Sequence, residues 1–89
     1  MKHLNITVKG RVQGVYFRAS TKEQATQLGI NGLVRNESDG SVYVEAEGED
    51  LQLDMLVGWL REGPAAARVD SVETTHGTVR NYIRFEITG

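Results

Sequence analysis

The chain has 89 residues, of which 39% are hydrophobic and 25% are charged, and its formal net charge is −2. This length allows one modest hydrophobic core, so we expect residues 1–89 to form a single domain. Because the chain contains no cysteine, disulfide bonds, a thiolate nucleophile and a cysteine-based metal site are all excluded. The acidic balance also argues against a general nucleic-acid-binding protein, which normally carries a basic surface.

The first ten residues, MKHLNITVKG, lack the apolar run of a signal peptide, and no stretch approaches membrane-spanning length. We therefore expect a cytoplasmic protein without nucleic-acid or membrane partners, and we expect it to act as a monomer.

Residues 4–9 alternate between apolar and polar side chains, which is the period of a half-buried strand. The stretch GRVQGVYFRAS, residues 10–20, follows this strand and contains two glycines and two arginines. Gly10 and Gly14 can adopt a positive φ and let the backbone approach a ligand closely. The N–H groups that open the next helix could bind an anion there, and Arg18 would add a planar guanidinium group matched to phosphate or carboxylate oxygens.

This spacing is neither a Walker A sequence nor GxGxxG, so a nucleotide site is disfavoured. On the stretch by itself, a plain tight turn and a site for a single phosphoryl group both remain open.

The predicted helix runs from about Phe17 to Leu28, a segment without glycine or proline, and Gly29 is a natural stop. Its start stays open, because Ser20 to Glu23 also fits a capping box. The Asp39-Gly40 pair then predicts a hairpin between two strands, residues 32–36 and 42–48. In the second of these strands three polar residues alternate with apolar ones, so we expect one face of it to contact water. The polar residues are Tyr43, Glu45 and Glu47.

Leu53, Leu56, Val57 and Leu60 follow the spacing of an amphipathic helix. Two further strands are expected near residues 68–75 and 82–88, and the alternation of Ile83, Phe85 and Ile87 makes the last the clearer of the two. The order of elements predicts an α+β, ferredoxin-like split βαβ sandwich. Its antiparallel sheet would have four to five strands, with both helices packed on one face. This fold hosts many functions and selects none of them.

Two motifs resemble the signatures of the acylphosphatase family. They are GRVQGVYFR at residues 10–18 and GLVRNESDGSV at residues 32–42, the second of which is similar to the pattern G-x-V-x-N-x-x-D-G-x-V. Weaker similarity extends over essentially the whole chain in the same order. The resemblance implies a small ferredoxin-like enzyme that hydrolyses the carboxyl–phosphate bond of a small-molecule acyl phosphate without a metal or cofactor.

The same resemblance implies a role for individual residues. The catalytic arginine would be Arg18 and the catalytic asparagine Asn36, and inorganic phosphate would be both the product and a competitive ligand. Two positions depart from the family's frequent pattern, Tyr16 in the loop and Leu33 after the glycine of the second motif. The implied phosphate-binding residues are Gln13, Gly14, Val15, Tyr16, Phe17 and Arg18.

This assignment is chemically reasonable, because an acyl phosphate carries a carboxylate leaving group of low pKa that needs little acid assistance. The remaining tasks are to bind the phosphoryl group and to hold a water in line with it. The side chain of Asn36, with one acceptor oxygen and one NH₂ donor group, can orient such a water. The alternative is a non-catalytic ferredoxin-like module that binds a small phosphorylated or anionic ligand, which would need Arg18 but has no evident use for Asn36.

Overall fold

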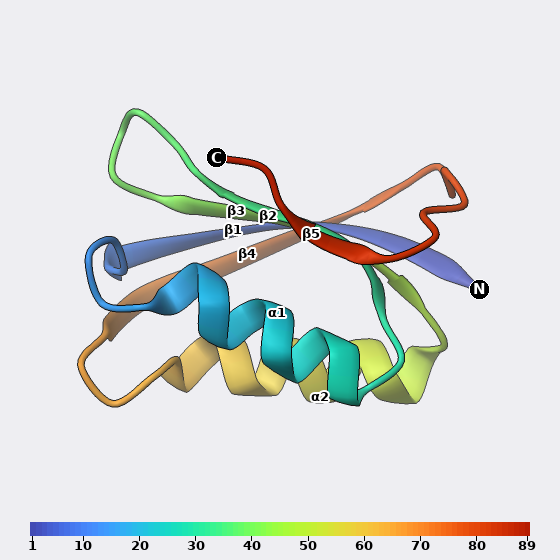
Figure 1. Ribbon diagram of the computed structural model, residues 1–89, viewed down its shortest axis with the longest axis horizontal. Helices are drawn as coiled ribbons and strands as arrows, with labels where there is room; N and C mark the ends of the chain where they lie inside the picture. The colour runs from blue at the N-terminus through green and yellow to red at the C-terminus, as the bar shows by residue number, and fades with distance from the viewer.

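The computed structural model describes all residues, 1–89, as two helices packed on one face of a five-stranded sheet (Figure 1). The strands are β1 (Lys2–Arg11), β2 (Asn31–Asn36), β3 (Val42–Gly48), β4 (Arg68–Gly77) and β5 (Phe85–Ile87). The helices are α1 (Phe17–Gln27) and α2 (Asp50–Glu62). This arrangement confirms the predicted ferredoxin-like α+β fold. Neither helix has the length and apolar character needed to cross a membrane.

The sheet is mixed, so the prediction of a wholly antiparallel sheet was wrong in one detail. The strand order is β4-β1-β3-β2-β5, and the pairing of β2 with β5 is parallel. The chain leaves β4 at one edge, crosses the open face of the sheet through residues 78–84 and joins the opposite edge in the direction of β2. Strand β5 is also shorter than its alternation predicted: Ile83 lies before it and is 80% exposed.

Helix α1 begins at Phe17, so the alternative start at the Ser20 to Glu23 capping box was wrong. Tyr16 precedes the helix with φ 61° and ψ 25°, and no side chain caps the helix. This left-handed residue turns the chain into the helix about one turn earlier than the capping box would. The start of α1 is thereby placed directly after the glycine-containing loop.

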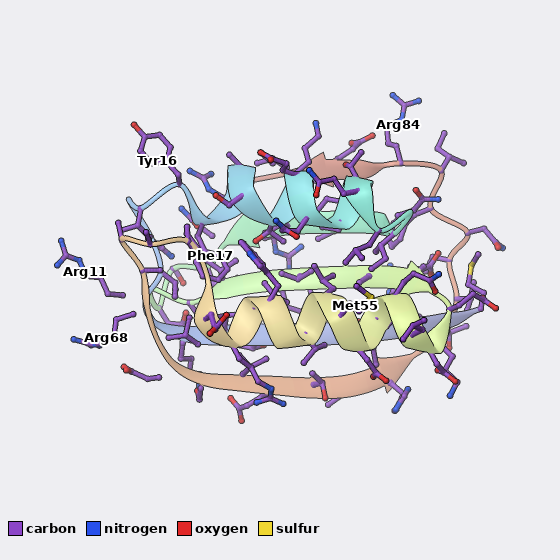
Figure 2. All side chains as sticks on the ribbon, turned by 90° about the horizontal axis from the view of Figure 1, so that it is seen from below. Arg11, Tyr16, Phe17, Met55, Arg68 and Arg84 are labelled. Atoms are coloured by element: carbon purple, nitrogen blue, oxygen red, sulfur yellow. The ribbon has the colours of Figure 1, made fainter.

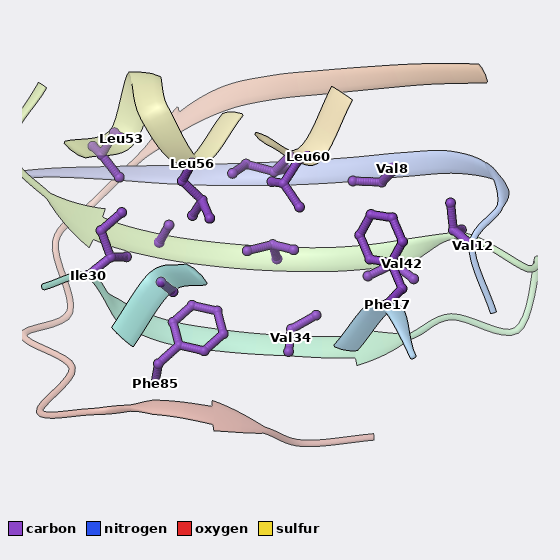
Figure 3. Packing of buried hydrophobic residues seen from close by; sticks show 14 of the residues in the cluster. Val8, Val12, Phe17, Ile30, Val34, Val42, Leu53, Leu56, Leu60 and Phe85 are labelled. Carbon is purple, nitrogen blue, oxygen red and sulfur yellow. The ribbon is translucent and has the colours of Figure 1, made fainter. Parts of the chain in front are cut away.

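The core lies between the helices and the sheet (Figure 3). Leu53, Leu56 and Leu60 form the buried stripe of α2, as their spacing predicted. Val12 and Phe17, at the two ends of the glycine-containing loop, are 1% and 2% exposed. Because both ends of the loop are anchored in the core, the loop between them is held in place by packing.

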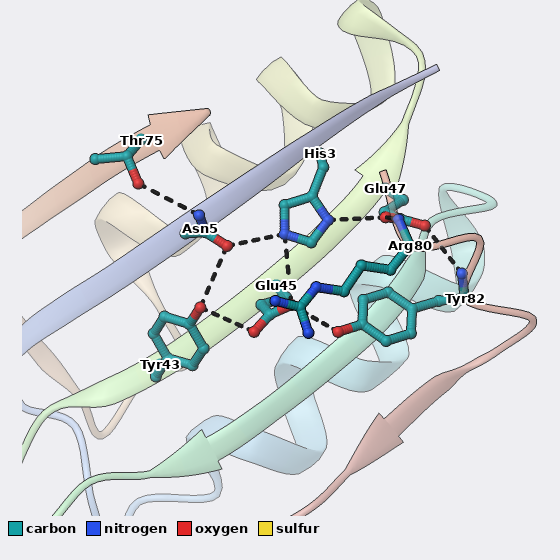
Figure 4. A network of polar contacts seen from close by, with 8 residues as sticks. All are labelled: His3, Asn5, Tyr43, Glu45, Glu47, Thr75, Arg80 and Tyr82. Carbon is teal, nitrogen blue, oxygen red and sulfur yellow. Dashed lines mark hydrogen bonds and ion pairs between the residues drawn. The ribbon is translucent and has the colours of Figure 1, made fainter. Parts of the chain in front are cut away.

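The face of the sheet opposite the helices is shielded from water at the end where β1 begins, although we expected this face of β3 to contact water. Glu45 and Glu47 are only 7% and 2% exposed, because residues 78–84 cover them (Figure 4). The Glu47 carboxylate accepts hydrogen bonds from the backbone N–H groups of Arg80 at 2.5 Å and Tyr82 at 2.9 Å, and His3 Nδ1 lies 2.8 Å from it. These partners stabilise a buried charge that would otherwise be costly.

Candidate active site

The loop between β1 and α1 has the backbone conformation that its glycines predicted. Gly10 has φ 135° and Gly14 has φ 75°. A Cβ atom on Gly10 would lie 2.1 Å from the carbonyl oxygen of Arg68 on the neighbouring strand β4, whereas a Cβ on Gly14 would meet no atom within 4 Å. Gly10 is therefore required by close approach of two backbones, and Gly14 by its turn on the exposed side of the loop.

A pocket of about 410 Å³ opens beside this loop. It brings together Arg18, from the first turn of α1, and Asn36, from the end of β2, although the two are far apart in the chain. Its lining residues are Val12, Gly14, Tyr16, Phe17, Arg18, Ala19, Asn36 and Ile87. Four of the six predicted phosphate-binding residues thus line the pocket, together with both predicted catalytic residues.

The other two, Gln13 and Val15, do not line the pocket. Val15 is buried, with 6% exposure, and the side chain of Gln13 turns toward the β2–β3 hairpin. There Gln13 Nε2 donates hydrogen bonds of 2.9 Å to the carbonyl oxygens of both Glu37 and Ser41. The Gln13 side chain therefore ties the loop to the hairpin that follows Asn36, a positioning role that sequence reasoning missed.

The C-terminal segment contacts both predicted catalytic residues. Arg18 Nη1 donates a hydrogen bond of 2.6 Å to the main-chain oxygen of Gly89, and the backbone N–H of Asn36 donates one of 3.0 Å to the same oxygen. A guanidinium group has five N–H donors, so Arg18 retains donors for a ligand. Neither Gly89 nor Ile87 carries a sequence signal for this position, because each is more than 50 residues from Asn36.

The side chain of Asn36 offers a free acceptor. Its Oδ1 atom is buried and accepts no hydrogen bond within the protein. Buried polar atoms are nearly always hydrogen-bonded, so an acceptor of this kind beside a pocket indicates a ligand or a water as its partner. The atom can accept a hydrogen bond from a bound water while the NH₂ group of the same side chain donates to a neighbouring oxygen.

No acidic side chain lines the pocket, and the carboxylates on the nearby hairpin have partners of their own. Asp39 accepts hydrogen bonds from the hydroxyl and backbone N–H of Ser41, which lower the pKa of its carboxyl group. Glu37 accepts a hydrogen bond of 2.7 Å from Arg35, which raises the pKa of that arginine. The only formal charge lining the pocket is therefore the positive charge of Arg18, a setting suited to an anion.

Two further observations complete the site. No cluster of three or more histidine, cysteine, aspartate or glutamate side chains has the geometry to hold a metal ion. Leu33, one of the two unusual positions, is not among the residues that line the pocket, and it pairs with Glu45 across the sheet. Leu33 therefore bears on packing of the open face, whereas Tyr16 lies at the pocket itself.

Fold and pocket together define a ferredoxin-like α+β protein in which a glycine-containing loop, one arginine and one asparagine meet at a single pocket. Comparison with known proteins identifies the family. The acylphosphatase family model matches residues 4–87, and the chain belongs to the acylphosphatase family.

The relatives that support this assignment come from bacteria and archaea. A protein of Marinobacter nauticus named acylphosphatase is 54% identical over 68 residues, which are 76% of this chain and 74% of that protein. One of Archaeoglobus fulgidus, with the same name, is 45% identical over 84 residues and covers 94% of each chain. The crystal structure of acylphosphatase from Bacillus subtilis covers all of both chains, with a TM-score of 0.97 and 32% sequence identity.

Proposed function

We propose that this protein hydrolyses the carboxyl–phosphate bond of small-molecule acyl phosphates, releasing a carboxylate and inorganic phosphate. Membership of the acylphosphatase family supports the reaction class. The observation that carries the proposal in this chain is the single pocket that contains Arg18, the Gly14 loop and the unpartnered Oδ1 of Asn36.

In the proposed mechanism the phosphoryl group binds at the loop between β1 and α1. Main-chain N–H groups of residues 13–18 and the remaining donors of Arg18 bind the phosphoryl oxygens. Charge on these oxygens is stabilised more strongly in the transition state if the donors are already oriented before the substrate arrives. The anchored ends of the loop, Val12 and Phe17, and the hydrogen bonds of Gln13 provide this orientation.

Asn36 orients the attacking water in this mechanism. The water donates one hydrogen bond to Asn36 Oδ1 and its oxygen attacks the phosphorus atom, while the bond between phosphorus and the carboxyl oxygen breaks on the opposite side. The electron pair leaves with the carboxylate, and the proton of the water passes to a phosphoryl oxygen, because an amide is too weak a base to hold it. Since the guanidinium of Arg18 and the dipoles of the backbone N–H groups stabilise the charge of the phosphoryl oxygens, the proposed reaction needs no metal or cofactor.

The test is the hydrolysis of benzoyl phosphate by the purified protein, with and without EDTA. We expect EDTA-insensitive turnover, a loss of about 10³-fold in kcat/KM for Arg18→Ala, and little recovery in Arg18→Lys, because an ammonium group cannot reproduce the planar guanidinium. Asn36→Ala should lower kcat about 10²-fold or more while inorganic phosphate still inhibits competitively.

Arg11→Ala is the matched control, because Arg11 is exposed, extends outward from the end of the molecule (Figure 2) and is not among the residues that line the pocket. Its kcat/KM should stay within about twofold of the unchanged protein, as expected for an exposed charge screened by solvent. Full activity of Asn36→Ala would contradict the proposed orientation of water. A folded protein that binds phosphate without turnover would instead support the binding-module alternative.

The proposed partner is therefore a small molecule, and we also propose a cytoplasmic monomer without nucleic-acid partners. Size-exclusion chromatography with light scattering tests the oligomeric state. Binding to RNA that weakens steeply with salt would contradict the absence of a nucleic-acid partner.

A further inference from the structure

Tyr16 has three properties that its place at the start of α1 does not require of a tyrosine. It is one of only two residues other than glycine with positive φ, at 61°, a conformation that costs about 1–2 kcal/mol for a residue with a side chain. Its side chain is 84% exposed (Figure 2), and no hydrogen bond to its hydroxyl group is formed within the protein. A glycine would adopt this backbone without strain. Because the ring is exposed and unpaired, it contributes little to folding.

The position of Tyr16 gives its ring a different role. Tyr16 lines the same pocket as Arg18 and Asn36. Ile87 lines it as well and is 42% exposed, although its register partner on β2, Val34, is fully buried. Ile87 lies on the edge strand β5, and its exposed side chain lies beside the pocket. Tyr16 and Ile87 thus place two exposed apolar side chains at one pocket.

The proposed direction of attack places the leaving group on their side. The acceptor oxygen of Asn36 is buried, so the water that it orients lies on the inner side of the phosphoryl group. In-line displacement requires the leaving carboxylate on the opposite side, and the acyl group therefore extends toward the solvent-facing mouth. Tyr16 and Ile87 are the two large apolar lining residues whose side chains are exposed to solvent, so we place the acyl group against them.

The charged side chains that line the pocket also bear on which acyl groups it can bind. Arg18 is the only cationic side chain that lines the pocket, and the proposed function assigns it to the phosphoryl group. An acyl group with a second carboxylate or phosphate would find no further cation in the pocket, whereas an aromatic or other apolar acyl group would contact the faces of two apolar side chains.

Resting on the proposed function, we infer that Tyr16 and Ile87 form an acyl-binding subsite that makes this protein prefer acyl phosphates with an apolar, above all aromatic, acyl group. Tyr16 is then a specificity-determining residue, which contacts the part of the substrate that does not react.

The experiment compares kcat/KM for benzoyl phosphate, acetyl phosphate and 4-carboxybenzoyl phosphate in the unchanged protein and in Tyr16→Gly, Tyr16→Phe and Ile87→Ala. The readout is the benzoyl-to-acetyl ratio of each variant relative to the unchanged protein, in which the intrinsic reactivities of the substrates cancel. Loss of the ring should lower this ratio about three- to tenfold, the size expected from one aromatic contact.

Tyr16→Phe should keep the ratio within about twofold, because it retains the ring, and Ile87→Ala should lower it in the same direction as Tyr16→Gly. The unchanged protein should favour benzoyl over 4-carboxybenzoyl phosphate. Tyr16→Gly should unfold at a urea concentration no lower than the unchanged protein, since glycine relieves the strained φ.

Turnover with an unchanged ratio in Tyr16→Gly would overturn the acyl-binding subsite and leave the proposed function standing. A lower unfolding midpoint for Tyr16→Gly would also overturn it, because the ring would then serve the fold. Absence of turnover of all three substrates by the folded protein would overturn the proposed function, and the subsite with it.

Discussion

Replacing Glu47 by glutamine is expected to destabilise the protein although it keeps the size of the side chain. The carboxylate is 2% exposed and accepts from two backbone N–H groups of the segment 78–84, with His3 as a third partner. In glutamine one of the two oxygens becomes an NH₂ donor. In the better of its two orientations the amide oxygen still faces His3 and Arg80, and the NH₂ group faces the N–H of Tyr82.

The expected magnitude follows from this geometry. One hydrogen bond to a charged acceptor is lost, which is worth about 1.5–3 kcal/mol, and the other two weaken because the charge is gone. We therefore expect Glu47→Gln to lower the free energy of unfolding by about 2 kcal/mol. Glu47→Ala should lower it by about 3–5 kcal/mol, because it removes the acceptor from all three partners.

Urea unfolding followed by circular dichroism measures both losses. With a denaturant dependence of about 1–1.5 kcal/mol/M for a chain of this size, Glu47→Gln should shift the midpoint by roughly 1.3–2 M. Glu73→Gln on strand β4 is the matched control, because its carboxylate is 65% exposed and pairs only with Lys9 at 3.5 Å. The control should change stability by less than about 0.5 kcal/mol. Equal shifts in the two variants would refute the role given to the buried carboxylate.

The other predictions concern pH, the loop and its anchor. Burial by itself would raise the pKa of Glu45, but hydrogen bonds from two tyrosine hydroxyls outweigh it and lower that pKa below its usual 4.5. The ionised Glu45 therefore stabilises the fold fully above about pH 4.5, and this stabilisation is lost as the pH falls further. A thermal midpoint that does not fall on acidification to pH 3 would contradict this. Burial and the hydrogen bond to Glu45 raise the pKa of Tyr43 to about 12. The protonated Tyr43 therefore stabilises the fold fully below about pH 10, and this stabilisation is lost as the pH rises toward 12. Spectrophotometric titration of tyrosine checks this. Gln13→Ala should cost about 1–2 kcal/mol of stability and lower kcat/KM for benzoyl phosphate, and an unchanged kcat/KM would contradict its positioning role. In Gly10→Ala the new Cβ would lie 2.1 Å from a carbonyl oxygen of β4, so the free energy of unfolding should fall by more than about 3 kcal/mol. In Gly14→Ala it should fall by only about 1–2 kcal/mol. Equal melting temperatures of the two variants would contradict the steric argument.

Local patterns in the sequence predicted most of the elements because each depends on neighbouring residues. The stripe of Leu53, Leu56 and Leu60 predicted α2, and these three leucines are the buried residues of that helix. Asp39 and Gly40 predicted the hairpin, and Asp39 caps it through hydrogen bonds to Ser41. Both glycines of the loop have the positive φ that was expected of them.

The errors arose where the environment of a residue comes from a distant part of the chain. Alternation in β3 predicts a wet face, yet Glu47 is buried because residues 78–84 return across it. The alternation that ends at Ile87 predicts a longer last strand, yet only three residues pair at the sheet edge, and they pair in parallel. Neither outcome can be read from a local period, since both depend on the path of the chain after β4.

The candidate site divides in the same way. Arg18 and Asn36 could be named as candidates because they lie in two compact motifs that resemble the acylphosphatase signatures, and both line the pocket. That Gln13 ties the loop to the hairpin, that Gly89 accepts from Arg18, and that Ile87 joins Tyr16 at the pocket are decided by contacts between segments up to 71 residues apart. The sequence by itself determined most of the elements, because these follow from local spacing, and it named the candidate groups of the site, because its motifs resemble those of a known family. Only the tertiary structure decided which groups are buried, partnered or exposed beside one another, because those properties depend on how the whole chain packs.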